Sequence, residues 1–313
     1  MKLRLHIFKF FLLATLITVM TSLACSTASR VDTNAELQHT AAALAVTQTY
    51  FERPTTQNPT QLVQKIETDL PTPFSDTPPP PIKTPDVNYE GIRFSFDDSI
   101  AESVQSATIP EQNLGDDFLP GGTYPTHFEF SFNQYAITNH TLNAKILIYP
   151  VEEYREISTF ASDQINALAF AIINRPGGSA RSTLPFLPLW PAAQLFSAQV
   201  SYFDFQNGSG VRFLTMFGQD IFPIDNFNLI YTYQGMTHDG RYYLSAVLPI
   251  SHPGLPDDGS DLIGEDYVDF YNSWDTYLPD TLRFLGEQML DSYFPSIVLL
   301  DELIKTIEIY PYP

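Results

Sequence analysis

Prolines divide this chain into a part that can form a compact fold and a part that cannot. Nine of the 25 prolines lie between residues 53 and 88, and four of them are consecutive, from Pro78 to Pro81. Proline fixes φ at about −65° and removes a backbone donor, which excludes a regular helix or a central strand. The sequence therefore predicts an extended, polyproline-like stretch that spans up to roughly 100 Å at about 3.1 Å per residue. A globular fold must come from residues 89–313.

The residues before the prolines complete a predicted tether over 25–88. The stretch 34–52, NAELQHTAAALAVTQTYFE, is rich in Ala, Thr and Gln and favours at most a loose helix. Two interpretations of the tether stay open: a spacer that lets the domain clear the wall or surface layer, and a disordered join whose length is not tuned. Both predict disorder.

The first 24 residues predict export. Lys2, Arg4 and Lys9 give a positive start, and an apolar run follows over residues 10–20. A membrane-spanning helix needs about 20 apolar residues, so this run is too short for a permanent anchor and is typical of a signal peptide.

Cys25 directly follows this segment and is the only cysteine in the chain. The sequence Ser22-Leu23-Ala24-Cys25 resembles the bacterial lipobox, in which a small residue precedes a cysteine whose thiol accepts a diacylglycerol before cleavage. Ser22 departs from the usual aliphatic residue of that motif. A lone cysteine forms no internal disulfide, so we expect lipidation of Cys25 and a membrane partner through its acyl chains, each contributing about 0.8 kcal/mol per buried CH2. Cleavage after Ala24 with an unmodified thiol is the alternative.

The charge of the chain excludes one class of partner. The net charge is −20, and it becomes −23 without the first 24 residues, which hold three basic and no acidic residues. Such a surface repels the phosphates of nucleic acids and anionic headgroups, so we expect no nucleic-acid partner. A hydrophobic content of 44% indicates a folded domain in the remainder.

Residues 89–313 predict a single globular α+β domain, an antiparallel β-sheet covered by helices. Alternation of apolar residues predicts strands, and apolar spacing of three and four predicts helices. The expected elements are strands at 89–96, 128–132 and 144–150, a helix at 151–174, hairpins at 199–217 around Asn207-Gly208 and at 229–250 around Asp239-Gly240, and helices at 266–290 and 295–308.

Two resemblances follow from these patterns. The lipobox-like start with its Ala/Thr-rich and Pro-rich spacer resembles uncharacterised envelope lipoproteins of environmental bacteria. The segments YEGIRFSF, GRYYLSAVLP and LLDELIKTIEI resemble the first strand, the late hairpin and the final helix and strand of the PsbP-like group of α/β/α sandwiches. That resemblance covers most of residues 89–310 and implies a binding or assembly accessory rather than an enzyme.

No local motif predicts catalysis. Gly208-Ser209-Gly210 and Gly177-Gly178-Ser179 each lack one glycine of the G-x-S-x-G nucleophile elbow. No phosphate loop, dinucleotide fingerprint or H-E-x-x-H occurs, so we expect no cofactor. The histidines after the signal stand apart in sequence and give no local zinc pair: His39, His127, His140, His238 and His252. A hydrolase site assembled from distant His, Asp and Ser residues remains an alternative.

The acidic loop at 257–266 is the one candidate for a cation. Asp257, Asp258, Asp261 and Glu265 supply carboxylate oxygens, which calcium prefers. Their spacing is not that of an EF-hand, and an acidic loop before a helix commonly serves for capping and solvation.

The segment 184–191, LPFLPLWP, is the candidate binding segment. It is almost wholly apolar, yet its prolines exclude a helix or a central strand. Buried, it is coil over one end of the sheet and completes the core, which is the expected case. Exposed, it is an apolar patch typical of a ligand groove or partner surface. Phe186 and Trp190 are the predicted binding residues.

We therefore expect a non-enzymatic, lipid-anchored binding or assembly module of the bacterial envelope, with an envelope protein or a small apolar molecule as its ligand. A hydrolase and a purely structural envelope component are the alternatives. A deep apolar cleft beside Trp190 would favour binding, and a contact between His, a carboxylate and Ser in a pocket would favour an enzyme.

Overall fold

The computed structural model describes residues 87–115, 121–177, 183–263 and 267–311. Cys25, the predicted signal peptide and the predicted tether up to residue 86 lie outside them. The described residues form an α+β fold around one seven-stranded antiparallel sheet, as predicted. Its strands, in spatial order, are β3 (Ser103–Ile109), β6 (His127–Asn133), β7 (Lys145–Pro150), β13 (Tyr242–Pro249), β12 (Ile230–Thr237), β10 (Gly208–Thr215) and β9 (Ala198–Phe205).

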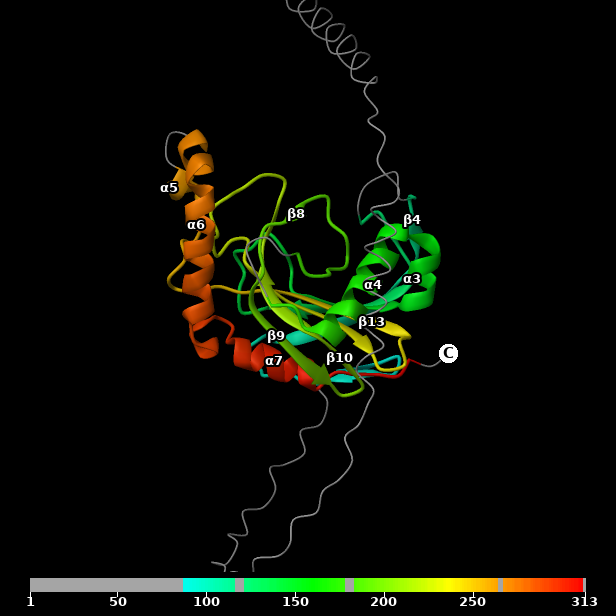
Figure 1. Cartoon of the computed structure of the whole chain (residues 1–313). Coiled ribbons are helices and arrows are strands. Elements are labelled where there is room, and N and C mark those ends of the chain that lie inside the picture. The colour runs from blue at the N-terminus through cyan, green and yellow to red at the C-terminus, as the bar shows by residue number, and fades with distance from the viewer. Residues whose placement is uncertain (1–86, 116–120, 178–182, 264–266, 312–313) are drawn as a thin grey trace, which may run out of the picture. The chain divides into compact units, whose positions relative to one another are not determined.

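Both faces of this sheet are covered, because alternate side chains of each strand point to opposite sides. On β7, Ile146 and Ile148 belong to one core, whereas Leu147 and Tyr149 belong to the other. Figure 1 shows α3 and α4 (green) on one side of the sheet and α6 and α7 (orange to red) on the other. We call these two sides the α4 face and the α7 face.

The α7 face is closed by regular elements. They are α6 (Tyr267–Glu287), α7 (Ile297–Lys305) and a three-stranded sheet of β1 (Val87–Tyr89), β2 (Ile92–Phe94) and β14 (Glu308–Ile309). The predicted apolar stripe of the last helix is confirmed, since all its members are buried: Ile297, Leu300, Leu303, Ile304 and Ile307.

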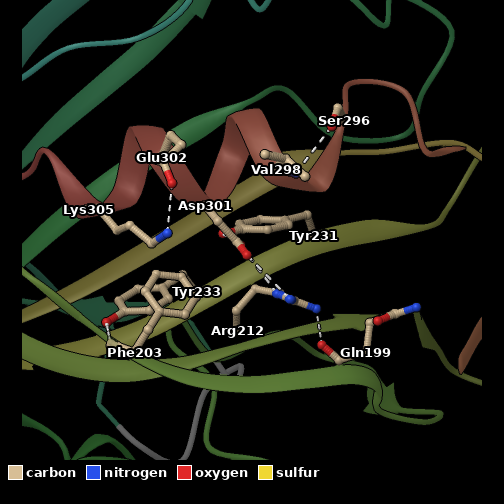
Figure 2. A network of polar contacts seen from close by, with 10 residues as sticks. All are labelled: Gln199, Phe203, Arg212, Tyr231, Tyr233, Ser296, Val298, Asp301, Glu302 and Lys305. Carbon is tan, nitrogen blue, oxygen red and sulfur yellow. Dashed lines mark hydrogen bonds and ion pairs between the residues drawn. The ribbon is translucent and has the colours of Figure 1, made fainter. Parts of the chain in front are cut away.

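One polar network holds α7 on the sheet (Figure 2). Asp301 of α7 pairs with buried Arg212 of β10, at 3.3 Å from Nε to Oδ1, and accepts a 2.9 Å hydrogen bond from the hydroxyl of Tyr231. Arg212 also donates to the carbonyl of Gln199 on β9. Burial raises the pKa of Asp301 even though Arg212 lies beside it. Arg212 thus compensates the negative charge of Asp301, although removing the two charged groups from water costs free energy.

The α4 face is covered partly by helices and partly by coil. The helices α3 (Val151–Ile157) and α4 (Thr159–Asn174) bury one face against the sheet, including Tyr154, Ile165 and Leu168. The proline-containing coil of residues 183–192 covers the rest. Smaller elements are β4 (Gln112–Asn113) paired with β5 (Thr123–Tyr124), β8 (Ala193–Gln194) paired with β11 (Phe217–Gly218), α5 (Ser260–Ile263) and a 3-10 turn at Leu290–Ser292.

Two predicted elements are each divided in the structure. The strand expected at 89–96 is confirmed only for residues 92–94 of β2, because Glu90 and Gly91 adopt positive φ (48° and 79°) and fold the chain back so that β1 pairs with β2. A Cβ on Gly91 would lie 2.1 Å from the carbonyl oxygen of Tyr310, so only glycine fits. The helix expected at 151–174 is broken at Ser158, whose extended backbone ends α3 and whose side chain caps α4 by accepting from the amide of Ala161.

The hairpins are confirmed, with one change in the first turn. Residues 206 and 207 form that turn, and Gly208 already belongs to β10. Glycine is needed there because a Cβ would lie 2.4 Å from the carbonyl oxygen of Met236, not because of a positive φ. Gly240 supplies the positive φ of the second hairpin, as expected. Within the described part of the chain, no helix combines the length and the hydropathy that crossing a bilayer requires.

Candidate functional site

The coil of residues 183–192 is held on the α4 face by one buried glutamine. Gln234 of β12 is fully buried, and its Oε1 accepts from the amide of Leu187 (3.0 Å) and from the hydroxyl of Tyr243 (2.6 Å). Its Nε2 donates to Thr232 and to Ser245, and Ser245 in turn donates to the carbonyl of Leu187. Both backbone groups of Leu187 are thereby satisfied, which fixes the coil although it has no secondary structure.

The predicted binding residues lie together on this coil. Phe186 is buried and Trp190 is half-buried. Their ring centroids are 4.8 Å apart, and both rings contact Phe217 of β11, at 4.6 Å and 4.7 Å. The structure therefore combines the two expectations for this segment: residues 184–187 are buried against the sheet, and residues 188–190 are only half-buried. Phe186 supports Trp190 from within the core.

A cavity of about 420 Å³ lies beside Trp190. Pro188, Leu189 and Trp190 line it from the coil, and the α4 face of β6 and β7 lines it from the sheet. On those strands Phe128 pairs with Ile148 and Glu129 with Leu147, so His127 and Glu129 share a face with Lys145 and Tyr149. We call this space the Trp190 cavity. Its size is in the range of small-molecule sites, about 300–1,000 Å³.

His127 presents a hydrogen-bond acceptor to the cavity. Its Nδ1 lies 2.9 Å from the carbonyl oxygen of Pro125, which can only accept, so Nδ1 carries the proton. Burial lowers the pKa of His127, which favours the neutral ring and leaves a lone pair on Nε2. The ring is fixed between Tyr124 and Tyr149, with centroids 5.2 Å and 4.6 Å away. Nε2 has no protein partner among the described residues.

Tyr149 brings a hydroxyl to the same cavity. The residue is only 2% exposed, and its hydroxyl bonds to no other residue that the structure describes. Burial raises the pKa of Tyr149 well above its ordinary value, so the group stays a neutral hydroxyl that both donates and accepts. This hydroxyl is not among the buried atoms left without a partner, so it reaches the surface of the cavity, where water or a ligand can bond to it.

The two charged residues that line the cavity neutralise each other. Nζ of Lys145 lies 2.9 Å and 3.0 Å from the two carboxylate oxygens of Glu129. Ser131 donates to the same carboxylate at 2.9 Å. Of the described lining residues, none carries a further charge. The cavity thus combines apolar walls with Nε2 of His127, the hydroxyl of Tyr149 and a compensated ion pair, and Tyr124, Thr141 and Asn143 add further polar side chains to its lining.

A second cavity, of about 480 Å³, lies on the other side of the coil. Leu189 and Trp190 line both cavities, and the second extends to Phe170 of α4, which is 64% exposed. Gln194 also lines it, and the Nε2 of this residue is buried without a hydrogen-bond partner in the described structure. Trp190 therefore separates two spaces on the α4 face.

The acidic loop is only partly described. The carboxylate of Asp258 accepts from the amide and the hydroxyl of Ser260, the pattern of a helix cap, which lowers its pKa. Asp257 is exposed, Glu265 lies outside the described residues, and the side chain of Asp261 is likewise not described. Across the described ranges, no group of three or more His, Cys, Asp or Glu side chains is placed to hold a metal ion.

The described histidines do not form a catalytic relay with serine and a carboxylate. Nε2 of His252 lies 3.2 Å from the hydroxyl of Ser292. However, Nδ1 of His252 accepts from the amide of Gly254, so Nε2 carries the proton and donates to the serine. The hydroxyl of Ser292 donates in turn to the carbonyl of Met289. This histidine is therefore not positioned to take a proton from Ser292.

Of the residues predicted to bind, Trp190 lines this cavity and Phe186 lies behind it. The sequence predicted no binding role for four other lining residues: His127, Glu129, Lys145 and Tyr149. A signal was present, because HFEFSFN places His127, Glu129 and Ser131 at alternate positions between three phenylalanines. Polar residues on the second face of an otherwise apolar strand indicate a site or a solvated surface. Comparisons with protein-family models, with curated proteins and with solved structures find no match for this chain.

Proposed function

We propose that this chain is an exported, lipid-anchored binding module of the bacterial envelope that holds a small ligand in the Trp190 cavity. The observation that carries the proposal is the combination of a half-buried tryptophan with two polar groups, on His127 and Tyr149, that have no partner in the described protein. Ligand sites typically pair apolar walls with a few placed polar groups in this way.

The position of the coil supports the same function. Gln234 accepts from the amide of Leu187 and Ser245 donates to the carbonyl of Leu187, so two buried polar side chains of the sheet hold the coil. Three further hydrogen bonds fix Gln234 itself, to Thr232, Tyr243 and Ser245. Binding residues commonly lie on loops that a rigid scaffold positions. Here the scaffold is the central sheet, and the coil presents Trp190 over it.

The proposed location in the bacterial envelope rests on the sequence. The charged start, the short apolar run and the lone Cys25 favour export and acylation. The resemblance to PsbP-like domains points to an accessory protein rather than an enzyme. A purely structural component and a hydrolase are the alternatives that the following experiment addresses.

Native mass spectrometry of the full chain, purified in detergent from bacterial membranes, tests the proposal. The wild-type chain should retain a small molecule at one per chain. Trp190→Ala should weaken retention by roughly 30-fold, since a buried aromatic contact contributes about 2 kcal/mol or more. The matched control is Phe160→Ala, which removes a half-exposed aromatic ring of α4 outside the cavity and should retain the molecule.

Two results would contradict the proposal. Equal retention by Trp190→Ala and wild type would exclude the cavity, and no retained molecule in any variant would favour a structural role. The denatured sample also gives the mass of the mature chain. We expect residues 25–313 with acyl groups on Cys25, and a free thiol there would refute the anchor.

A further inference from the structure

The polar groups of the Trp190 cavity restrict the chemistry of its ligand, if the proposed function holds. We infer that the ligand is an uncharged molecule with a flat apolar body and a hydroxyl group, and that this hydroxyl donates to Nε2 of His127 and accepts from the hydroxyl of Tyr149.

The two unpartnered groups of the cavity fix the hydrogen-bond directions that a ligand must match. Nε2 of His127 can only accept, because the single ring proton is on Nδ1, bonded to the carbonyl of Pro125. The hydroxyl of Tyr149 stays protonated and has its proton to donate. The two rings lie against each other, with centroids 4.6 Å apart. One ligand group that both donates and accepts satisfies both residues, and a hydroxyl is the smallest such group.

The charges that line the cavity favour a neutral ligand. Glu129 and Lys145 compensate each other, with both carboxylate oxygens engaged, so the cavity offers no free countercharge among the described residues. A charged ligand would lose its hydration without an ionic partner. The net charge of −20 adds repulsion for any anion. An uncharged ligand is therefore favoured.

The walls of the cavity favour a flat apolar ligand. Leu147 on the sheet and Leu189 and Trp190 on the coil give the cavity flat or apolar walls, and Trp190 rests on Phe186 and Phe217. Aromatic walls favour stacked or edge-on rings. A phenol or a ring alcohol meets all three requirements.

Four naphthalene derivatives test this inference by equilibrium dialysis against the full purified chain at pH 7. 2-Naphthol donates and accepts, 2-methoxynaphthalene only accepts, naphthalene does neither, and 2-naphthoate is an anion. We expect 2-naphthol to bind about 10- to 30-fold more tightly than naphthalene, because it adds two neutral hydrogen bonds. 2-Methoxynaphthalene should fall between the two, and 2-naphthoate should bind most weakly.

Variants assign the two hydrogen bonds. Tyr149→Phe should reduce the preference for 2-naphthol over naphthalene to roughly threefold, and His127→Phe should remove the advantage of 2-naphthol over 2-methoxynaphthalene. Unchanged binding of naphthalene by each variant shows that the cavity is intact, so a folding defect is recognised.

The binding results distinguish a failure of the proposed function from a failure of the inferred ligand class. If no probe binds, or if Trp190→Ala leaves all affinities unchanged, the proposed function fails. If all probes bind through Trp190 but 2-naphthol has no advantage over naphthalene, or if 2-naphthoate binds best, the ligand class inferred here is wrong and the cavity remains a binding site.

Discussion

The two faces of the central sheet are covered in different ways. On the α7 face, a regular helix buries its apolar stripe, and its one buried carboxylate, Asp301, is paired with Arg212 and Tyr231 (Figure 2). On the α4 face, a coil replaces part of the helical cover, and beside it His127 and Tyr149 keep polar atoms without a partner in the described structure.

This difference indicates that the two faces of the sheet have different roles. A helix satisfies its own backbone and closes the surface beneath it. A proline-containing coil does not satisfy its own backbone groups, so these groups need side-chain partners such as Gln234. Two cavities lie along this coil, and Leu189 and Trp190 line both. We interpret the α7 face as the side that stabilises the fold and the α4 face as the side that binds.

The largest expected loss of stability follows a substitution on the α7 face. Asp301→Ala should lower the free energy of unfolding by about 3–5 kcal/mol, because Arg212 then lies buried without a countercharge. Glu302→Ala is the matched control one residue along α7, since its pair with Lys305 is exposed and should contribute less than about 1 kcal/mol. Urea denaturation of the two variants measures the difference. Similar losses would mean that the network does not stabilise α7.

A smaller loss of stability is expected when Gln234, which holds the coil, is replaced. Gln234→Ala should lower the free energy of unfolding by about 2–3 kcal/mol, because it leaves the Leu187 amide and the Tyr243 hydroxyl unpaired in the core. It should also speed hydrogen exchange at the Leu187 amide. Gln219→Ala removes an exposed hydrogen bond to Pro191, next to the same coil, and should cost less than about 0.5 kcal/mol. If exchange at Leu187 is equally slow in both variants, Gln234 does not fix the coil.

Much of the fold could be predicted from local patterns, and the exceptions have local causes. The hairpins and the terminal helix follow from alternation and from the apolar stripe. Strand β3 was missed because SVQSATI is mostly polar, as suits an edge strand that is only partly buried. The breaks at Gly91 and Ser158 depend on contacts with Tyr310 and on a cap, which periodicity does not reveal.

The site could be predicted only on the side that is continuous in sequence. Trp190 and Phe186 stand in one apolar, proline-containing segment, so composition alone predicts them as binding candidates. His127 and Tyr149 come from two strands and meet through the register of β6 and β7. That register is set by the packing of the whole sheet and by turn geometry, which single positions do not encode.

Removal of one buried hydroxyl from each face tests the central claim most directly. Tyr231→Phe and Tyr149→Phe delete the same atom from two tyrosines that are 0% and 2% exposed. Tyr231→Phe should lower the free energy of unfolding by about 1.5–3 kcal/mol, because its hydroxyl bonds to the carboxylate of Asp301. Tyr149→Phe should change it by less than about 0.5 kcal/mol, because its hydroxyl has no partner in the described fold. An equal loss in both variants, measured by urea denaturation of the ligand-free chain, would contradict the assignment of the α4 face to binding.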